Sequence, residues 1–145
     1  MFHKIKDVKT MPDYNLIVHF VEGQTKEYDI KRLAGNISAF NKLIEDKPLF
    51  EKVSVDVGGY GIVWNDDLDL SCDELWEHGK KIDTPFDGLM SMREATEMWG
   101  LNESTLRRAI IYGKLLEGID VHKFGKQWVV VFDSMVREYG EPKVS

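Results

Sequence analysis

The sequence predicts an α+β fold in two parts, a small antiparallel-sheet domain at residues 1–82 and a mainly helical domain at residues 90–145. Alternating apolar and polar residues, typical of strands, dominate the first part, whereas helix start signals dominate the second. Between the two parts, Pro85 and Gly88 interrupt both patterns. We therefore expect a linker at residues 83–89.

The first elements expected are three strands that form an antiparallel meander. In the second of them, Leu16, Val18 and Phe20 alternate with Ile17 and His19, so one side is buried and the other is mixed. Tight turns separate the strands because Pro-Asp and Glu-Gly pairs stand between them. The strands are expected at residues 2–9, 14–21 and 24–29.

Short helices and a second hairpin are expected next. Ser38 is placed to cap a helix that Pro48 ends, and Gly58 with Gly59 is placed to turn a hairpin. After an acidic stretch, Ser71 and Glu74 have the spacing of a capping box. The expected elements are a helical turn at residues 30–33, a helix at 39–45, strands at 53–57 and 60–64, and a helix at 72–80.

The second part begins with signals for two helices joined by a tight turn. Ser91 and Glu94 form a capping box before a helix at residues 92–99, which Gly100 ends in a left-handed conformation. Asn102 is placed to cap a second helix at residues 103–112. Helical spacing puts one apolar side of each helix against the other, through Ala95, Met98, Leu101, Leu106 and Ile110.

Polar and basic residues are left on the outer side of the second helix. Hydroxyls and helix N-terminal amides suit phosphates, and guanidinium groups suit either phosphates or the acceptor edge of guanine. This surface therefore suits the major groove of double-stranded DNA. The outer residues are Ser104, Thr105, Arg107, Arg108 and Ile111.

A hairpin and a last helix are expected after Gly113. Residues 119–131 predict two strands around Phe124 and Gly125, and Trp128 is expected to contribute to the core. The hairpin would bring lysines to the DNA backbone, which they contact without recognising the base sequence. Asp133 starts the last helix, at residues 134–139. The lysines counted as DNA-binding are Lys114, Lys123 and Lys126.

Two resemblances follow from these residues. The stretch SMREATEMWGLNESTLRRAIIY with the hairpin after it resembles the winged helix-turn-helix of excisionases and MerR-like regulators. The phrases LIVHFVEGQTKEYDIKRL, PLFEKVSVD and IVWNDDLDLSCDELW resemble a bacterial domain-of-unknown-function family of α+β domains. The second resemblance implies a fold and an antitoxin context, because members occur beside helix-turn-helix domains or near toxin-like genes.

Charge is distributed unevenly along the chain. The net charge is -6, yet residues 1–88 hold 11 Lys and Arg against 17 Asp and Glu, whereas residues 89–145 hold eight of each kind. A neutral domain joined to an acidic one should bind non-specific DNA poorly. Affinity would then depend on a correct site or on the avidity of a dimer.

The sequence shows no recognisable catalytic or metal-binding pattern. The four histidines are scattered, and Asp66, Asp67 and Asp69 lack the glycine and final glutamate of a calcium loop. Cys72 begins a helix without a recognisable general base, so an inert thiol is favoured over a nucleophile. We expect no metal, no cofactor and no enzymatic activity.

The function expected from the sequence is sequence-specific DNA binding by a transcriptional regulator, in a narrower version an antitoxin that represses its own operon. The alternative is a non-enzymatic protein-interaction adaptor whose helix-turn-helix does not bind DNA, which the acidic balance favours. Partners considered are double-stranded DNA, a protein bound by the acidic N-terminal domain, and a second copy in a homodimer. No apolar run is long enough for a membrane span and no signal peptide is recognised, so a cytoplasmic location is expected.

Overall fold

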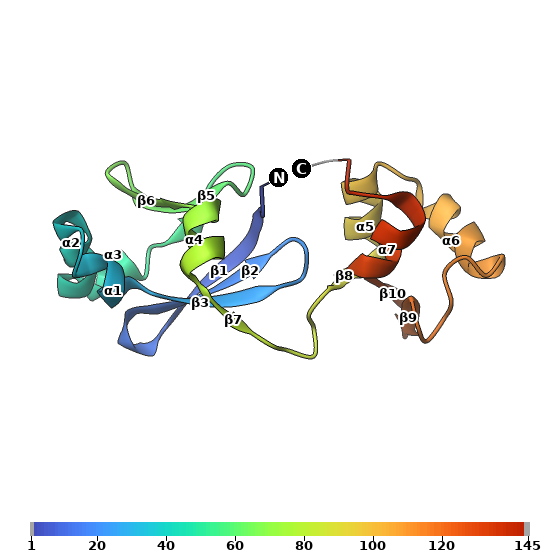
Figure 1. Cartoon of the computed structure of the whole chain (residues 1–145), viewed down its shortest axis with the longest axis horizontal. Coiled ribbons are helices and arrows are strands. Elements are labelled where there is room, and N and C mark those ends of the chain that lie inside the picture. Colours follow the sequence, from blue (N-terminus) through green and yellow to red (C-terminus); the bar gives the residue numbers. More distant parts are fainter. Residues whose placement is uncertain (1, 144–145) are drawn as a thin grey trace. The chain divides into compact units, whose positions relative to one another are not determined.

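The computed structural model describes residues 2–143 and confirms the α+β fold class (Figure 1). The chain divides into two compact units, Met1–Asp87 and Gly88–Ser145, and each has its own hydrophobic core. The division falls within residues 83–89, the expected linker, although Leu89 already lies in a strand.

A four-stranded antiparallel sheet forms the base of the N-terminal unit. The expected meander is present, and a fourth strand that the sequence analysis missed pairs with its third strand. Gly79 ends the preceding helix in an extended conformation, and a Cβ there would lie 2.4 Å from the Leu75 carbonyl oxygen. The helix expected at residues 72–80 therefore ends at His78. The strands are β1 (Ile5–Met11), β2 (Asn15–Phe20), β3 (Thr25–Asp29) and β7 (Lys80–Ile82).

A second sheet of three strands replaces the expected hairpin and acidic loop. The Asn65 side chain accepts hydrogen bonds from the Asp67 and Leu68 amides, both at 2.9 Å, and so closes a tight turn. Leu68 and Leu70 beyond the turn are buried, which makes the acidic stretch a strand with one apolar side. The strands are β4 (Ser54–Val55), β5 (Gly61–Asn65) and β6 (Leu68–Ser71).

Short helices complete the N-terminal unit. Pro48 was expected to end a helix, but it lies in the first turn of a new one, where its missing amide hydrogen is not needed. The Asp46 side chain caps that helix by accepting from the Leu49 amide. The helices are α1 (Ile30–Ala34), α2 (Asn41–Glu45), α3 (Lys47–Phe50) and α4 (Cys72–His78), with 3-10 turns at Pro12–Tyr14 and Ser38–Phe40.

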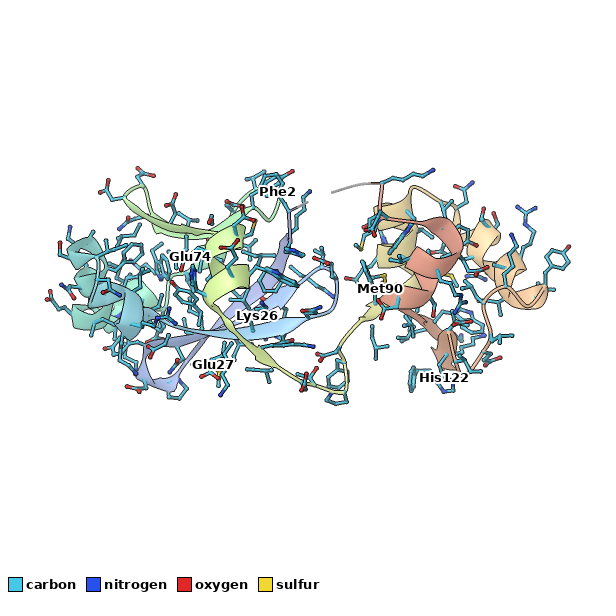
Figure 2. The ribbon with its side chains drawn as sticks, in the orientation of Figure 1. Phe2, Lys26, Glu27, Glu74, Met90 and His122 are labelled. Carbon is cyan, nitrogen blue, oxygen red and sulfur yellow. The ribbon has the colours of Figure 1, made fainter. Side chains whose placement is uncertain are left out.

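Only half of the expected capping box at Ser71 forms. Ser71 Oγ accepts from the Glu74 amide at 3.1 Å, as predicted. The Glu74 carboxylate instead accepts from the Tyr28 hydroxyl at 2.8 Å, so a tertiary contact has taken the place of the local one. Figure 2 shows Glu74 on α4.

The C-terminal unit has a helix pair, a hairpin and a closing helix, as expected, and one strand that was missed. Leu89–Ser91 is too short to show alternation, yet it adds an edge to the hairpin and gives the sheet order β8-β10-β9. The elements are β8 (Leu89–Ser91), α5 (Met92–Trp99), α6 (Glu103–Ile111), β9 (Val121–Phe124), β10 (Gln127–Val131) and α7 (Phe132–Tyr139).

The caps of the helix pair largely agree with the sequence. The capping box of Ser91 and Glu94 is complete, with both hydrogen bonds at 3.0 Å, and Gly100 has a φ of 64°. The prediction for Asn102 was wrong, because its side chain makes no capping hydrogen bond. Its carbonyl oxygen accepts from the Thr105 amide at 3.0 Å instead.

The core of the C-terminal unit fixes the angle of the two helices. Ala95 and Leu106 are fully buried between α5 and α6, which confirms the expected inner sides. Trp99 is also buried, and its indole nitrogen donates to the Gly140 carbonyl at 2.7 Å. Trp128 is half-buried and packs against this core, in agreement with its expected role.

Candidate nucleic-acid interface

The outward side of α6 carries most of the residues expected to bind DNA. Ser104, Arg107 and Arg108 are exposed, whereas Thr105 is half-buried. Ile111, one turn further along the same side, has 76% of its surface exposed. The helix thus presents hydroxyl, guanidinium and apolar groups together, the chemistry that contacts phosphates, guanine edges and thymine methyl groups in a major groove.

A groove of about 280 Å³ lies between the start of α5, the start of α6 and the hairpin. Three cationic side chains line it, Arg93 from α5, Arg107 from α6 and Lys126 from the hairpin turn. Arg93 was not among the predicted site residues, because its position on the first helix showed no link to the second. The lining also includes Glu103, Gln127 and Trp128.

The arginines of the groove are held by exposed carboxylates of their own helices. Arg107 Nη2 lies 3.3 Å from Glu103 Oε2, and Arg93 Nε lies 3.4 Å from Glu97 Oε1. Ion pairs this exposed contribute about 0.2 to 1 kcal/mol each. A phosphate entering the groove could therefore replace either carboxylate at little cost to the fold.

The remaining basic residues of this surface have no carboxylate partner within residues 2–143. Arg108 Nε donates only to the Ser104 carbonyl oxygen, at 3.4 Å. The ammonium of Lys123 lies 5.6 Å from the centre of the Trp128 ring, a cation–π contact. Lys114 and Lys126 are exposed. Their charges are available to an anionic partner.

A buried carboxylate fixes the base of the hairpin. Asp120 accepts from the Leu116 amide at 2.9 Å, from Ser134 Oγ at 2.7 Å and from Arg137 Nη1 at 3.0 Å. These bonds, with Arg137 first, hold the pKa of Asp120 well below its usual range. Arg137 also donates to the Lys114 carbonyl at 3.4 Å. The loop before the hairpin is thereby tied to α7.

Sequence reasoning missed this network for a physical reason. Asp120 and Arg137 are 17 positions apart, on a loop and a helix whose packing follows no local pattern. The available signal was a single acid placed directly before an otherwise acid-free hairpin. In proteins generally, an aspartate at such a position is more often exposed in a turn than buried with hydrogen-bond partners.

The N-terminal unit holds a separate polar cluster beside a cavity of about 230 Å³. Glu74 accepts from Tyr28 and lies 3.1 Å from His78 Nδ1. Burial, followed by the hydrogen bond to Glu74, raises the pKa of Tyr28 above its ordinary value, because the protonated hydroxyl is the form that donates to the carboxylate. Arg32 and Lys80 also line the cavity, together with the carboxylates of Glu27 and Asp29.

Cys72 is buried, and burial raises the pKa of its thiol, which lowers its reactivity. In residues 2–143, no group of three or more His, Cys, Asp or Glu side chains is arranged to hold a metal ion. Over the same range, no helix combines the length and apolar character needed to cross a membrane.

The paired helices α5 and α6, with the hairpin after them, define a helix-turn-helix protein. Residues 81–144 match the family described as a helix-turn-helix domain. Residues 5–81 match the family described as Protein of unknown function (DUF2442), and the chain belongs to that family. The predicted combination of an uncharacterised N-terminal domain with a C-terminal helix-turn-helix is confirmed. No curated protein and no solved structure matches the chain.

Proposed function

We propose that this protein binds double-stranded DNA at specific sequences and regulates transcription, without enzymatic activity. The observation that carries the proposal is the basic groove, in which Arg93, Arg107 and Lys126 converge from three elements beside the exposed side of α6. Helix-turn-helix domains typically place their second helix in the major groove. Such a role also requires access to the chromosome, so we propose a cytoplasmic location.

The arrangement supports separate residues for contact with the DNA backbone and for contact with the bases. The groove would hold one phosphodiester strand between α6 and the hairpin, so Arg93, Arg107 and Lys126 would act on the backbone. Arg108 does not line the groove and shares the outer side of α6 with Ile111. Arg108 is therefore proposed to contact a base edge.

Two features of charge support a role for a second copy and for a protein partner. The C-terminal residues carry no net charge, so one helix-turn-helix should bind weakly, and two copies on neighbouring half-sites would bind by avidity. The acidic N-terminal unit suits a basic protein partner. An antitoxin that represses its own operon is the narrower form of this proposal.

The test is fluorescence-anisotropy binding of the full chain to labelled duplex DNA from upstream of its own gene. Binding should exceed that to a random duplex of equal length. The logarithm of affinity should fall linearly with the logarithm of salt concentration, by about 0.9 per phosphate contact. A chain that binds neither duplex at low salt would favour the adaptor function.

The adaptor function rests on one observation of its own. Glu103 lines the groove beside Arg107 and places a negative charge where a phosphate would lie. If the pair of Glu103 and Arg107 never opens, the surface suits a protein with mixed charges better than DNA. The affinity of a Glu103→Gln variant for DNA distinguishes these two cases.

A further inference from the structure

A large aromatic side chain stands at the turn of the hairpin. Phe124 is the last residue of β9, and 61% of its surface is exposed. Phe124 pairs with Gln127 across a two-residue turn of Gly125 and Lys126, in which Gly125 has a φ of 61°. A glycine at the first turn position suits the tight hairpin turns that match the twist of the strands. Phe124 is thus held at a defined tip.

The register places Phe124 on the face of the hairpin that is turned away from the core. Val121 and Val130 pair on the buried face, and Lys123 and Trp128 pair two residues nearer the tip on that same face. Phe124 must therefore lie on the opposite face. His122 shares that face, and its ring contacts the Phe124 ring edge-on, with the ring centres 4.7 Å apart. Figure 2 shows His122 on the hairpin.

The hairpin is the most consistently cationic segment near the groove. Its residues, Val121 to Val131, include two lysines and one histidine and no acidic residue. Lys126 lies beside Phe124 in the turn and lines the groove. An apolar ring next to a lysine, on a segment without acidic residues, suits a ligand that combines negative charge with flat apolar surfaces. Double-stranded DNA offers both where the minor groove exposes the edges of stacked bases.

We infer that Phe124 is a wedge that enters the minor groove of double-stranded DNA and separates two stacked base pairs. This inference rests on the proposed function. With α6 in the major groove and one phosphate strand in the basic groove, the next feature beyond that strand is the minor groove. Phe124 stands at the edge of the groove, because Lys126 next to it in the turn and Gln127 opposite it both line the groove, and that minor groove would lie beyond this edge. Apolar side chains used in this way unstack a base step and bend the duplex.

Three duplexes of equal length separate minor-groove contact from other binding. They are alternating A·T, alternating G·C and alternating inosine·C, which differs from G·C only by lacking the amino group in the minor groove. The full chain should bind the A·T and inosine·C duplexes more tightly than the G·C duplex. Phe124→Ala should lose about tenfold in affinity for the first two and should no longer distinguish the three.

Insertion has its own spectroscopic readout. A pyrrolocytosine base placed in the inosine·C duplex, which leaves the minor groove unchanged, should brighten when the full chain unstacks it. Phe124→Ala should abolish the increase, and Phe124→Leu should restore part of it because leucine also serves as a wedge. Phe86→Ala is the matched control, since Phe86 is 73% exposed but lies outside the hairpin, and it should behave as the unchanged chain.

The outcomes separate the two proposals. A chain that binds none of the three duplexes, nor its own upstream DNA, overturns both DNA binding and the wedge. A chain that binds DNA equally well with and without Phe124, or whose binding leaves pyrrolocytosine fluorescence unchanged, overturns the wedge alone. Because Phe124 is exposed, circular dichroism and melting of Phe124→Ala should match those of the unchanged chain.

Discussion

Two arginine–carboxylate pairs in the C-terminal unit have similar geometry and opposite surroundings. Arg137 lies 3.0 Å from Asp120, whose side chain is 3% exposed, whereas Arg107 lies 3.3 Å from Glu103, whose side chain is 51% exposed. The first carboxylate is a buried acceptor for three donors, and the second has water as an alternative partner. Burial, more than distance, therefore distinguishes an anchor of the fold from a pair that a phosphate can open.

Removing the buried anchor should have the largest effect. Asp120→Ala leaves the Leu116 amide and Ser134 hydroxyl without their acceptor, and we expect the C-terminal unit to lose about 3 to 5 kcal/mol of stability. Urea unfolding of the full chain, followed by tryptophan fluorescence, measures the loss. Glu103→Ala is the matched control and should cost less than about 1 kcal/mol. Equal losses in both variants would contradict the comparison.

The same anchor should make stability depend on pH in the acidic range. The pKa of Asp120 is lower in the folded state than in the unfolded state, where a free aspartate has a pKa of about 3.9. Its stabilisation is therefore complete above the unfolded value and is lost as pH falls toward the folded value. Subtracting the pH profile of Asp120→Asn from that of the unchanged chain isolates this contribution. If the difference in stability between the two chains grew as pH fell, it would contradict a lowered pKa of Asp120 in the folded state.

The exposed arginines should separate into two roles. Arg108→Ala should narrow the gap between operator and random DNA by about 1 to 3 kcal/mol, because a guanidinium on a base edge discriminates between sequences. Arg107→Ala should weaken binding to both duplexes alike, because Arg107 lies in the groove with Arg93 and Lys126. Competition anisotropy with the two duplexes measures both effects. If Arg107→Ala narrows the gap and Arg108→Ala weakens both duplexes alike, Arg107 contacts the base and Arg108 the backbone.

The lysines of the hairpin should act on the backbone. Changing Lys123 and Lys126 together to Ala should weaken binding to every duplex and reduce the salt slope by about 2. Lys143→Ala, an exposed lysine near the end of the described chain, is the control and should leave the slope unchanged. If the double variant has an unchanged salt slope, the hairpin lysines do not contact the DNA backbone.

Opening the exposed pair should have the smallest effect. Glu103→Gln frees Arg107 and removes a negative charge from the groove, so affinity for any duplex should rise a few-fold while stability changes by less than about 0.5 kcal/mol. Anisotropy and urea unfolding measure the two quantities on the same sample. Unchanged affinity would mean that the groove does not hold a phosphate.

The sequence predicted the elements whose signals are local. Ser91 and Glu94 cap each other's backbone amides, and Gly100 closes the helix with its amide on the Thr96 carbonyl, so the start and end of α5 agree with the prediction. The same serine and glutamate spacing at Ser71 predicted the start of α4 correctly, but the glutamate half of the box does not form, because Tyr28 on β3 takes the Glu74 carboxylate. A local motif predicts which hydrogen bonds can form, whereas tertiary contacts determine which of them do form.

The missed elements depend on partners that are distant in the sequence. Strands β7 and β8 have three residues each, too few for alternation to be recognised. They form because β7 pairs with the edge of β3 and β8 with the edge of β10. The sequence predicted only part of the candidate site, because the rest also depends on distant contacts. The stripe on α6 follows helical spacing, but the approach of Arg93 to Lys126 requires the packing of α5 against β10.

The contact between Lys123 and Trp128 gives the hairpin a built-in optical reporter. Indole emission responds to a charge held near the ring, and the Lys123 ammonium lies 5.6 Å from the centre of that ring. If Lys123 leaves the ring for a phosphate, the emission of Trp128 changes while that of buried Trp99 does not. Engagement of the hairpin can then be followed in stopped-flow experiments on the unlabelled protein, separately from contacts made by α6.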